Sequence, residues 1–344
     1  MTVFLVTDIN DNQKYNYSLF ENLGKYDIDK NLLVIGSPQA ADIILFSTLG
    51  LNDNEILNIP RHPLVKAYLP KCYLICDRDK PYPVLPGLYT ALPKLKFVSF
   101  KAWHKYFSSI FYLAGHNPYI RELRDIHQDK PVYLFSFTGS LTSRVRKKLF
   151  ALTLKRTDVL IKKTQTNIFW ENFFWVTGIK ETVENREYLI SYAKEILKSK
   201  FILCPKGNGN SSYRFFEVME AGRVPVLISD NYVLPDIPYN WDDIVIRIAE
   251  NNVARTEEII SSNEHRFEQM ALLNRKVYEE CFLNKSRFIY QNFERLKDQK
   301  PLTKNRNYAL FLLYWVGMFK SVYNVKKLHR SLFNVLATFK KKFV

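Results

Sequence analysis

Residues 200–235 read KFILCPKGNGNSSYRFFEVMEAGRVPVLISDNYVLP, and this stretch decides the fold class. The apolar run over 201–204 predicts a buried strand, a glycine-containing loop follows it, and residues 213–221 have the apolar spacing of a helix. Gly222 is expected to end that helix, and residues 224–229 predict a second strand. A strand, a loop, a helix and a strand in this order form one unit of a parallel sheet, so the sequence predicts an α/β protein.

Similar apolar runs recur along the chain, five before about residue 126 and five after it, with helical spacing between many of them. These runs read VFLVT, NLLVIG, DIILFS, CYLIC, KFVSF, VYLFSF, DVLI, KFILC, VPVLIS and DIVIRI. A short polar link, HQDKP, separates the two groups. We therefore predict a Rossmann-like domain over residues 1–127, a second over 128–300 and a helical tail over 301–344. The two domains are expected to face a central cleft.

The composition is that of an ordinary folded protein, with 47% hydrophobic and 24% charged residues among 344. The four cysteines have neither zinc-site nor disulfide-framework spacing, and the first residues lack the pattern of a signal peptide. Both observations predict a reduced, cytoplasmic setting. The formal net charge is +16, and residues 301–344 contain nine Lys or Arg and no acidic residue. The tail is therefore expected to be strongly basic.

The loop between the two strands of the opening segment is a predicted anion site. In a parallel sheet, a loop that leaves a strand and opens a helix presents free amides and a positive helix end to a ligand. Gly207 and Gly209 would let the backbone approach a phosphate, and Ser211 or Ser212 would cap the helix. The Walker A pattern and the G-x-G-x-x-G fingerprint are both absent, which argues against ATP hydrolysis and NAD chemistry.

Arg214 and Glu217 lie one turn apart on the predicted helix. A cation in the first turn is unfavourable for the helix dipole, so Arg214 would need a compensating anion, which a diphosphate would supply. On spacing alone, an ordinary ion pair between Arg214 and Glu217 on a solvated face is about equally expected. The spacing by itself leaves both interpretations open.

The same segment resembles the nucleotide-sugar-binding signature of exostosin-family glycosyltransferases. In that family a strand ending in Pro and Gly leads to S-x-R-x-x-E, a Gly, P-V and an acidic-aromatic turn ending in Pro. The matching positions are Pro205, Gly207, Ser212, Arg214, Glu217, Gly222, Pro225, Val226, Asp230 and Pro235. The resemblance covers about residues 132–296 and includes an F-x-G turn at Gly139, followed by a basic residue that is Arg144 or Arg146. Arg223 departs from the pattern, since the family often has Cys there.

The resemblance implies a GT-B fold that binds the donor mainly in its second domain. It also implies inverting transfer of a sugar from a UDP- or GDP-linked donor to a carbohydrate acceptor, with no metal cofactor. In this reading Arg214 would hold the diphosphate and stabilise the leaving charge, while Glu217 would accept hydrogen bonds from the ribose hydroxyls. Gly139 and Arg144 would face the phosphates from the other side. The donor site would be completed by Pro205, Gly207 and Ser212.

An inverting transfer needs a general base near the acceptor hydroxyl, and a carboxylate of the N-terminal half is the expected source. Asp77 and Asp79 follow the run CYLIC, and Asp8 has the same relation to VFLVT. A turn or helix-cap role is more frequent for such carboxylates, and Asp79 is the preferred candidate among them. Packing roles are expected for His104 and His116. Asp77 and Asp79 also form a D-x-D string, which makes metal dependence worth testing.

Two other functions stay open. A sugar-nucleotide binder without activity would share the same donor signature. A nucleic-acid-binding protein is favoured by the net charge and by 46 Phe and Tyr residues. Most of those aromatic residues lie inside apolar strand runs, and no DNA- or RNA-binding motif is present, so we expect no nucleic-acid partner.

The basic tail predicts contact with a membrane surface. Residues 308–319 are apolar but too few to span a bilayer, which needs about 20 residues. From 322 to 336, apolar residues recur at helical spacing among Lys and Arg, the pattern of a basic amphipathic helix. The first part of the tail is expected to pack back onto the first domain, as the C-terminal helix of many GT-B proteins does. The second part carries more positive charge than packing requires, so through it we expect residues 301–344 to bind anionic lipid, which would place the enzyme at the inner face of a membrane beside a lipid-linked glycan acceptor.

Overall fold

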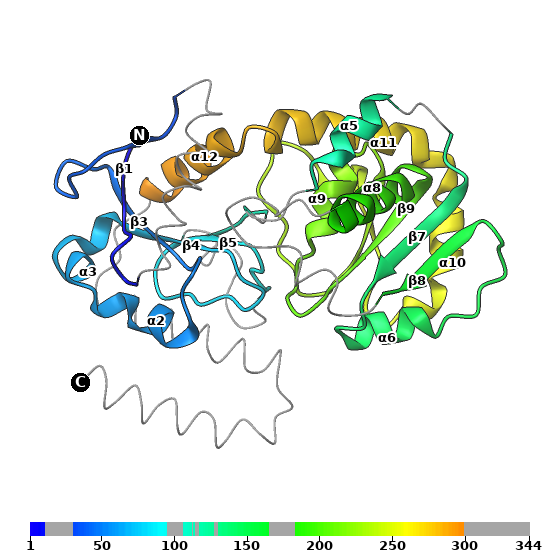
Figure 1. Ribbon diagram of the computed structural model, residues 1–344, viewed down its shortest axis with the longest axis horizontal. Helices are drawn as coiled ribbons and strands as arrows, with labels where there is room; N and C mark the ends of the chain where they lie inside the picture. The colour runs from blue at the N-terminus through cyan, green and yellow to red at the C-terminus, as the bar shows by residue number, and fades with distance from the viewer. Residues whose placement is uncertain are drawn as a thin grey trace, which may run out of the picture.

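The computed structural model of the chain consists of two α/β domains, each built on a parallel sheet (Figure 1). It describes residues 1–10, 30–94, 106–111, 113, 117–126, 130–164 and 183–298. The predictions for the tail and for His104 and His116 lie outside the described residues. No helix among the described residues is long and apolar enough to cross a membrane.

The first sheet has the strand order β2-β1-β3-β4-β5-β6, and all its strands are parallel. The strands are β1 (Thr2–Leu5), β2 (Leu33–Val34), β3 (Ile43–Ser47), β4 (Cys72–Cys76), β5 (Gly87–Tyr89) and β6 (Phe107–Ser109). Every residue of β3 and β4 is buried, as expected for central strands covered on both faces. Two short helices, α2 (Asp53–Asn58) and α3 (Pro63–Tyr68), connect β3 to β4.

The sequence pattern did not predict β5 and β6, because each has three residues and neither forms a run of branched apolar side chains. At Gly87 the backbone passes so close to β4 that an added Cβ would lie 1.9 Å from the carbonyl oxygen of Leu74. The φ of Gly87 is also +154°, so this strand needs glycine at its first position. The predicted strand KFVSF, over 96–100, lies outside the described residues.

The second sheet has the order β11-β10-β9-β7-β8 and is also parallel. Its strands are β7 (Tyr133–Gly139), β8 (Val159–Lys163), β9 (Ser199–Pro205), β10 (Val224–Ile228) and β11 (Ile246–Arg247). The order reverses between β7 and β9, since β8 lies on one side of β7 and all later strands lie on the other. Ligands of such sheets bind at the carboxyl ends of the strands where the order reverses. The prediction of an α/β fold with two Rossmann-like domains is confirmed.

Helices cover the second sheet. They are α6 (Arg144–Phe150), α8 (Val183–Leu197), α9 (Tyr213–Glu220), α10 (Thr256–Ser262) and α11 (Phe267–Val277). All but α10 lie where the apolar spacing is helical. Residues 263–298 contain neither Gly nor Pro, yet they do not form one helix, because a π-helical turn over Tyr278–Phe282 interrupts them. A new helix, α12 (Lys285–Lys297), begins after Asn284, whose side chain accepts a hydrogen bond from the amide of Arg287.

Two helices cross between the domains. α5 (Tyr119–Ile126) precedes the second sheet in the chain and packs against α8 and α9, whereas α12 runs back over the first sheet (Figure 1). The hydroxyl of Ser108 on β6 donates a hydrogen bond to Oδ1 of Asn292 on α12 at 2.6 Å. The division between residues 127 and 128 therefore separates the two sheets, while the helices next to that division and at the end of the second domain are exchanged.

Direct contacts also join the domains. The backbone amide of Lys94 donates to the carbonyl of Asn231 at 2.7 Å, and the amide of Val233 donates to the carbonyl of Leu92 at 3.0 Å. The apolar core continues from the first sheet into the second domain, and in it the ring of Phe111 packs against aromatic residues of α9, the π-helical turn and α12. These contacts hold the facing edges of the two domains together.

Candidate functional site

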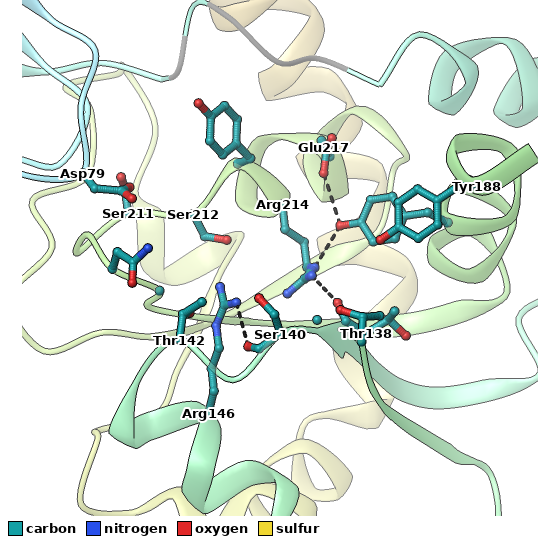
Figure 2. A pocket seen from close by; sticks show the side chains of 16 residues that line it. Asp79, Thr138, Ser140, Thr142, Arg146, Tyr188, Ser211, Ser212, Arg214 and Glu217 are labelled. Atoms are coloured by element: carbon teal, nitrogen blue, oxygen red, sulfur yellow. Dashed lines mark hydrogen bonds between the residues drawn. The ribbon is translucent and has the colours of Figure 1, made fainter. Parts of the chain in front are cut away.

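A pocket opens at the carboxyl ends of β7 and β9, the place where the order of the second sheet reverses (Figure 2). Its wall is formed by the end of β7, the loop after β9, the first two turns of α9 and side chains of α6 and α8. Asp79, from the loop after β4, is the residue that the first domain contributes to the described lining. Part of the segment 200–235 thus forms one side of the pocket.

Arg214 extends from the first turn of α9 into the pocket. Its Nε donates to the hydroxyl of Tyr192 at 2.9 Å, and its Nη1 donates to the carbonyl of Leu203 at 3.5 Å. Its Nη2 donates to the carbonyl of Thr138, and the guanidinium carbon lies 4.7 Å from the ring centroid of Phe137. Burial acts to lower the pKa of Arg214, but neighbouring groups, Tyr192 foremost, raise it overall. The guanidinium is therefore charged and held in one orientation.

Glu217 is one turn further along α9 and is buried. The hydroxyl of Tyr192, which accepts a hydrogen bond from Arg214, donates to Oε2 of Glu217 at 3.2 Å. The two residues that the sequence analysis singled out are thus linked through Tyr192 of α8. Sequence reasoning missed Tyr192, because it lies in an ordinary helical pattern with no motif around it and becomes a neighbour of α9 only in the folded chain.

Arg146 of α6 supplies a second guanidinium to the pocket, whereas Arg144 is exposed and does not line it. Figure 2 shows Arg146 and Arg214 entering from opposite walls. Nη1 of Arg146 donates to the carbonyl of Ser140 at 3.2 Å, and Nη2 donates to the carbonyl of Pro205 at 3.5 Å. Burial, and next the charge of Arg214, lower the pKa of Arg146 to about 10. The pocket therefore holds two cations whose mutual repulsion an anion would relieve.

Three polar atoms buried in the pocket wall have no hydrogen-bond partner among the described residues. They are Oγ1 of Thr138, Oγ1 of Thr142 and Nε of Arg146. Ser212 occupies the N-cap position of α9, yet its hydroxyl caps no backbone amide. A buried polar atom without a partner costs about 1–3 kcal/mol, so this wall fits a ligand rich in hydrogen-bond acceptors, such as a phosphate.

The glycines of the pocket allow close approaches within the protein. An added Cβ at Gly207 would lie 3.1 Å from Nη2 of Arg146, and one at Gly139 would lie 3.3 Å from Nη2 of Arg214. At Gly209 an added Cβ would lie 2.9 Å from the Cα and carbonyl oxygen of Asp79, across the domain interface. Any side chain at Gly209 would therefore push the two domains apart at the rim of the pocket.

The three carboxylates considered as bases have different environments. Asp79 lines the pocket. Asp77 is buried, and its backbone amide donates to the hydroxyl of Thr48 at 3.1 Å. Asp8 is exposed and lies 3.3 Å from Nε2 of His62, whose Nδ1 accepts from the first turn of α3. Asp79 is therefore the one of the three that lines the pocket, and its charge acts on Arg146. No group of three His, Cys, Asp or Glu side chains among the described residues could hold a metal ion.

The family model described as Exostosin GT47 domain matches residues 97–263. Exostosin-1 of Drosophila melanogaster is 27% identical over 177 residues, which are 49% of this chain and 23% of that protein. The Exostosin-1 homolog of Caenorhabditis elegans is 32% identical over 99 residues, 28% of this chain and 26% of that protein. A probable glucuronoxylan glucuronosyltransferase of Arabidopsis thaliana, IRX7, is 34% identical over 100 residues, 29% of this chain and 21% of that protein. Each match thus spans about a quarter of the relative's own length.

Solved structures with a related arrangement are more distant. MurG of Acinetobacter baumannii is 11% identical, with a TM-score of 0.38 over 86% of this chain and 99% of that one. WaaG, a glycosyltransferase involved in lipopolysaccharide biosynthesis, is 10% identical, with a TM-score of 0.36 over 87% of this chain and 100% of that one. Scores of this size carry no argument about the ligand of the pocket.

Proposed function

We propose that the protein is a glycosyltransferase that moves a sugar from a nucleotide-sugar donor to a carbohydrate acceptor, because residues 97–263 match the model of the exostosin GT47 domain. One observation supports the proposal most strongly. Two partly buried guanidinium groups, of Arg146 and Arg214, enter one pocket at the point of the second sheet where ligands of parallel α/β domains bind. The relatives match over a small part of their length, so the activity is proposed from the site and the domain together.

The diphosphate of the donor matches the charge of this pocket. Arg214 has five N–H groups, of which three are engaged by the protein, so the remaining two are available for phosphate oxygens. Arg146 and the hydroxyls of Thr138 and Thr142 offer further donors from the opposite wall. The uncapped start of α9 adds its positive end. Since these groups meet the phosphate charge, we propose that transfer needs no metal ion and that the donor carries UDP or GDP.

In the proposed reaction the acceptor hydroxyl attacks the anomeric carbon as the bond from that carbon to the diphosphate oxygen breaks, which inverts the configuration. A base removes the proton of the attacking hydroxyl, and Asp79 is the proposed base because it brings a first-domain carboxylate to the pocket. Arg146 and Arg214 would stabilise the negative charge that develops on the leaving diphosphate. Glu217, oriented by Tyr192, would accept hydrogen bonds from the ribose hydroxyls.

A thermal-shift screen against UDP, GDP, CMP and their sugars, in buffer with EDTA, tests the donor site. A ligand that binds only the folded state raises the melting temperature, so at least one nucleotide should do so. Arg214→Ala should lose the shift, while Arg144→Ala, which removes a charge outside the pocket, should keep it. A wild-type protein that responds to no nucleotide, or an Arg214→Ala protein that responds fully, would contradict the proposal.

Product analysis distinguishes an active glycosyltransferase from a sugar-nucleotide binder without activity. Wild-type protein that responds to a nucleotide sugar should transfer the sugar to a glycan acceptor or, in the absence of an acceptor, hydrolyse the donor slowly. Binding without either product, across a panel of acceptors, would identify the chain as a sugar-nucleotide binder.

A further inference from the structure

The positive charge of this chain is concentrated in two segments. Of its 50 Lys and Arg residues, nine lie in residues 301–344 and eight in residues 139–164. Of its 34 Asp and Glu residues, Asp158 alone lies in either segment. The rest of the chain therefore has equal numbers of basic and acidic residues, and the whole excess of +16 belongs to these two segments. The second of them lies within the described residues.

Residues 139–164 run from the end of β7 through α6 and β8, beside the pocket. Lys162 and Lys163 end β8 and pair in register with Thr138 and Gly139, two residues of the pocket wall. α6 packs against β8. Arg144 and Lys147, one turn apart on α6, are exposed, as are Lys162 and Lys163. Between β7 and α6, Leu141 is 44% exposed. We call these five residues, Leu141, Arg144, Lys147, Lys162 and Lys163, the basic face.

The four cations of the basic face form no ion pair with the described part of the chain. The carboxylates nearest in the fold are engaged elsewhere. Asp158 is held by Arg156 through two hydrogen bonds of 2.6 and 2.8 Å, and Glu250 accepts from Nζ of Lys206 at 2.6 Å. Glu257 accepts the backbone amide of Lys155 at 2.8 Å. Four exposed like charges on one edge of a domain repel one another, and an external anion would offset that repulsion.

We propose that the basic face binds the surface of an anionic membrane and turns the mouth of the pocket toward it. The exposed Leu141 among cations is the observation that favours lipid, because interfacial sites combine apolar side chains that enter the headgroup region with Lys and Arg around them. Nucleic acid is a poorer partner, because the exposed residues of this segment include no aromatic side chain on which a base would stack.

Vesicle co-sedimentation of the 344-residue chain tests the proposal without any need for enzyme activity. The test variant is Lys162→Gln with Lys163→Gln, and the matched control is Lys194→Gln with Lys198→Gln. Both control lysines are exposed and belong to the same domain, but they lie at the end of α8, at the amino end of β9 and away from the pocket. The two variants have the same net charge.

On vesicles with about one third anionic phospholipid, the test variant should bind about 25-fold more weakly than wild type, about fivefold for each charge lost. The control should bind within about twofold of wild type. Leu141→Ser should also weaken binding to vesicles. The same variant should bind a polyuronate, an anionic polymer without an apolar layer, as strongly as wild type does. Equal weakening of the test and control variants would show a response to net charge alone and overturn the proposal. So would binding to the polyuronate but not to vesicles, or unchanged binding of Leu141→Ser to vesicles.

Discussion

Replacing Arg146 by Met should separate ligand binding from stability, because this side chain is kept in the pocket at an electrostatic cost. The folded protein lowers the pKa of Arg146 from 12.5 to about 10. This difference means that the charged side chain destabilises the folded state by about 3 kcal/mol. The group is charged in both the folded and unfolded states near pH 7.5, so the full cost applies there. Methionine removes that cost and fills much of the same volume.

The substitution also removes favourable contacts. Arg146 donates to the carbonyls of Ser140 and Pro205, for about 1 kcal/mol each, and lies 5.6 Å from the ring centroid of Phe137, for about 0.5–1 kcal/mol. These losses nearly offset the relief of burial and repulsion. We expect the free energy of unfolding to change by less than about 1 kcal/mol, which is within about 3 °C in melting temperature.

Binding of a diphosphate should respond quite differently. A charge-assisted hydrogen bond contributes about 1.5–3 kcal/mol, so Arg146→Met should weaken the binding of inorganic pyrophosphate about 10- to 150-fold. Calorimetric titration in EDTA measures the affinity, and thermal denaturation without ligand measures the stability. Arg144→Met is the control, since it removes a neighbouring charge outside the pocket, and should change binding less than about threefold. Unchanged pyrophosphate affinity in Arg146→Met, or an equal loss in Arg144→Met, would refute the assignment of Arg146 to the phosphates.

Three further predictions concern transfer and location. Arg214→Ala and Glu217→Gln should each lower the rate of sugar transfer at least about a hundredfold in a coupled assay. Glutamine is chosen at position 217 because it keeps the volume of the buried Glu217 side chain. Near wild-type rates in both variants would refute the donor site. Transfer should survive chelation with EDTA, because Arg146 and Arg214 meet the diphosphate charge; complete loss that manganese or magnesium restores would point instead to the D-x-D string at Asp77. Deletion of residues 331–344 should reduce co-sedimentation with anionic but not neutral vesicles, and equal recovery of the deletion and the full chain would remove the role of the tail.

One wall of the pocket could be predicted from the sequence because its parts are neighbours in the chain. Gly207 and Ser212 lie in the loop after β9, Arg214 and Glu217 lie on the helix that follows, and that local unit places all four in the pocket wall. The order of elements in a parallel sheet puts such a loop at the ligand edge, so no tertiary information was needed.

The remaining wall depends on contacts between distant segments, which periodicity does not reveal. Tyr192 reaches the pocket from α8, and Asp79 reaches it from the other domain. The choice between Arg144 and Arg146 depends on the direction of each side chain along α6, and the F-x-G turn gave no information about that direction. Likewise, β5 is defined by how closely Gly87 approaches Leu74 and not by its own composition.

The exchange of helices between the domains has a consequence for the order of folding. Ser108 bonds to Asn292, 184 positions later, and the ring of Tyr73 on β4 packs edge-on against Phe293 of the same late helix. While the ribosome is still making the second domain, the first sheet has no α12 to cover that face, and its apolar side chains are open to chaperones or to a wrong partner. Domains usually fold in the order of synthesis. Here the first domain is completed last. A chain that stalls or is truncated before residue 285 would lack α12, and one face of the first sheet would stay uncovered.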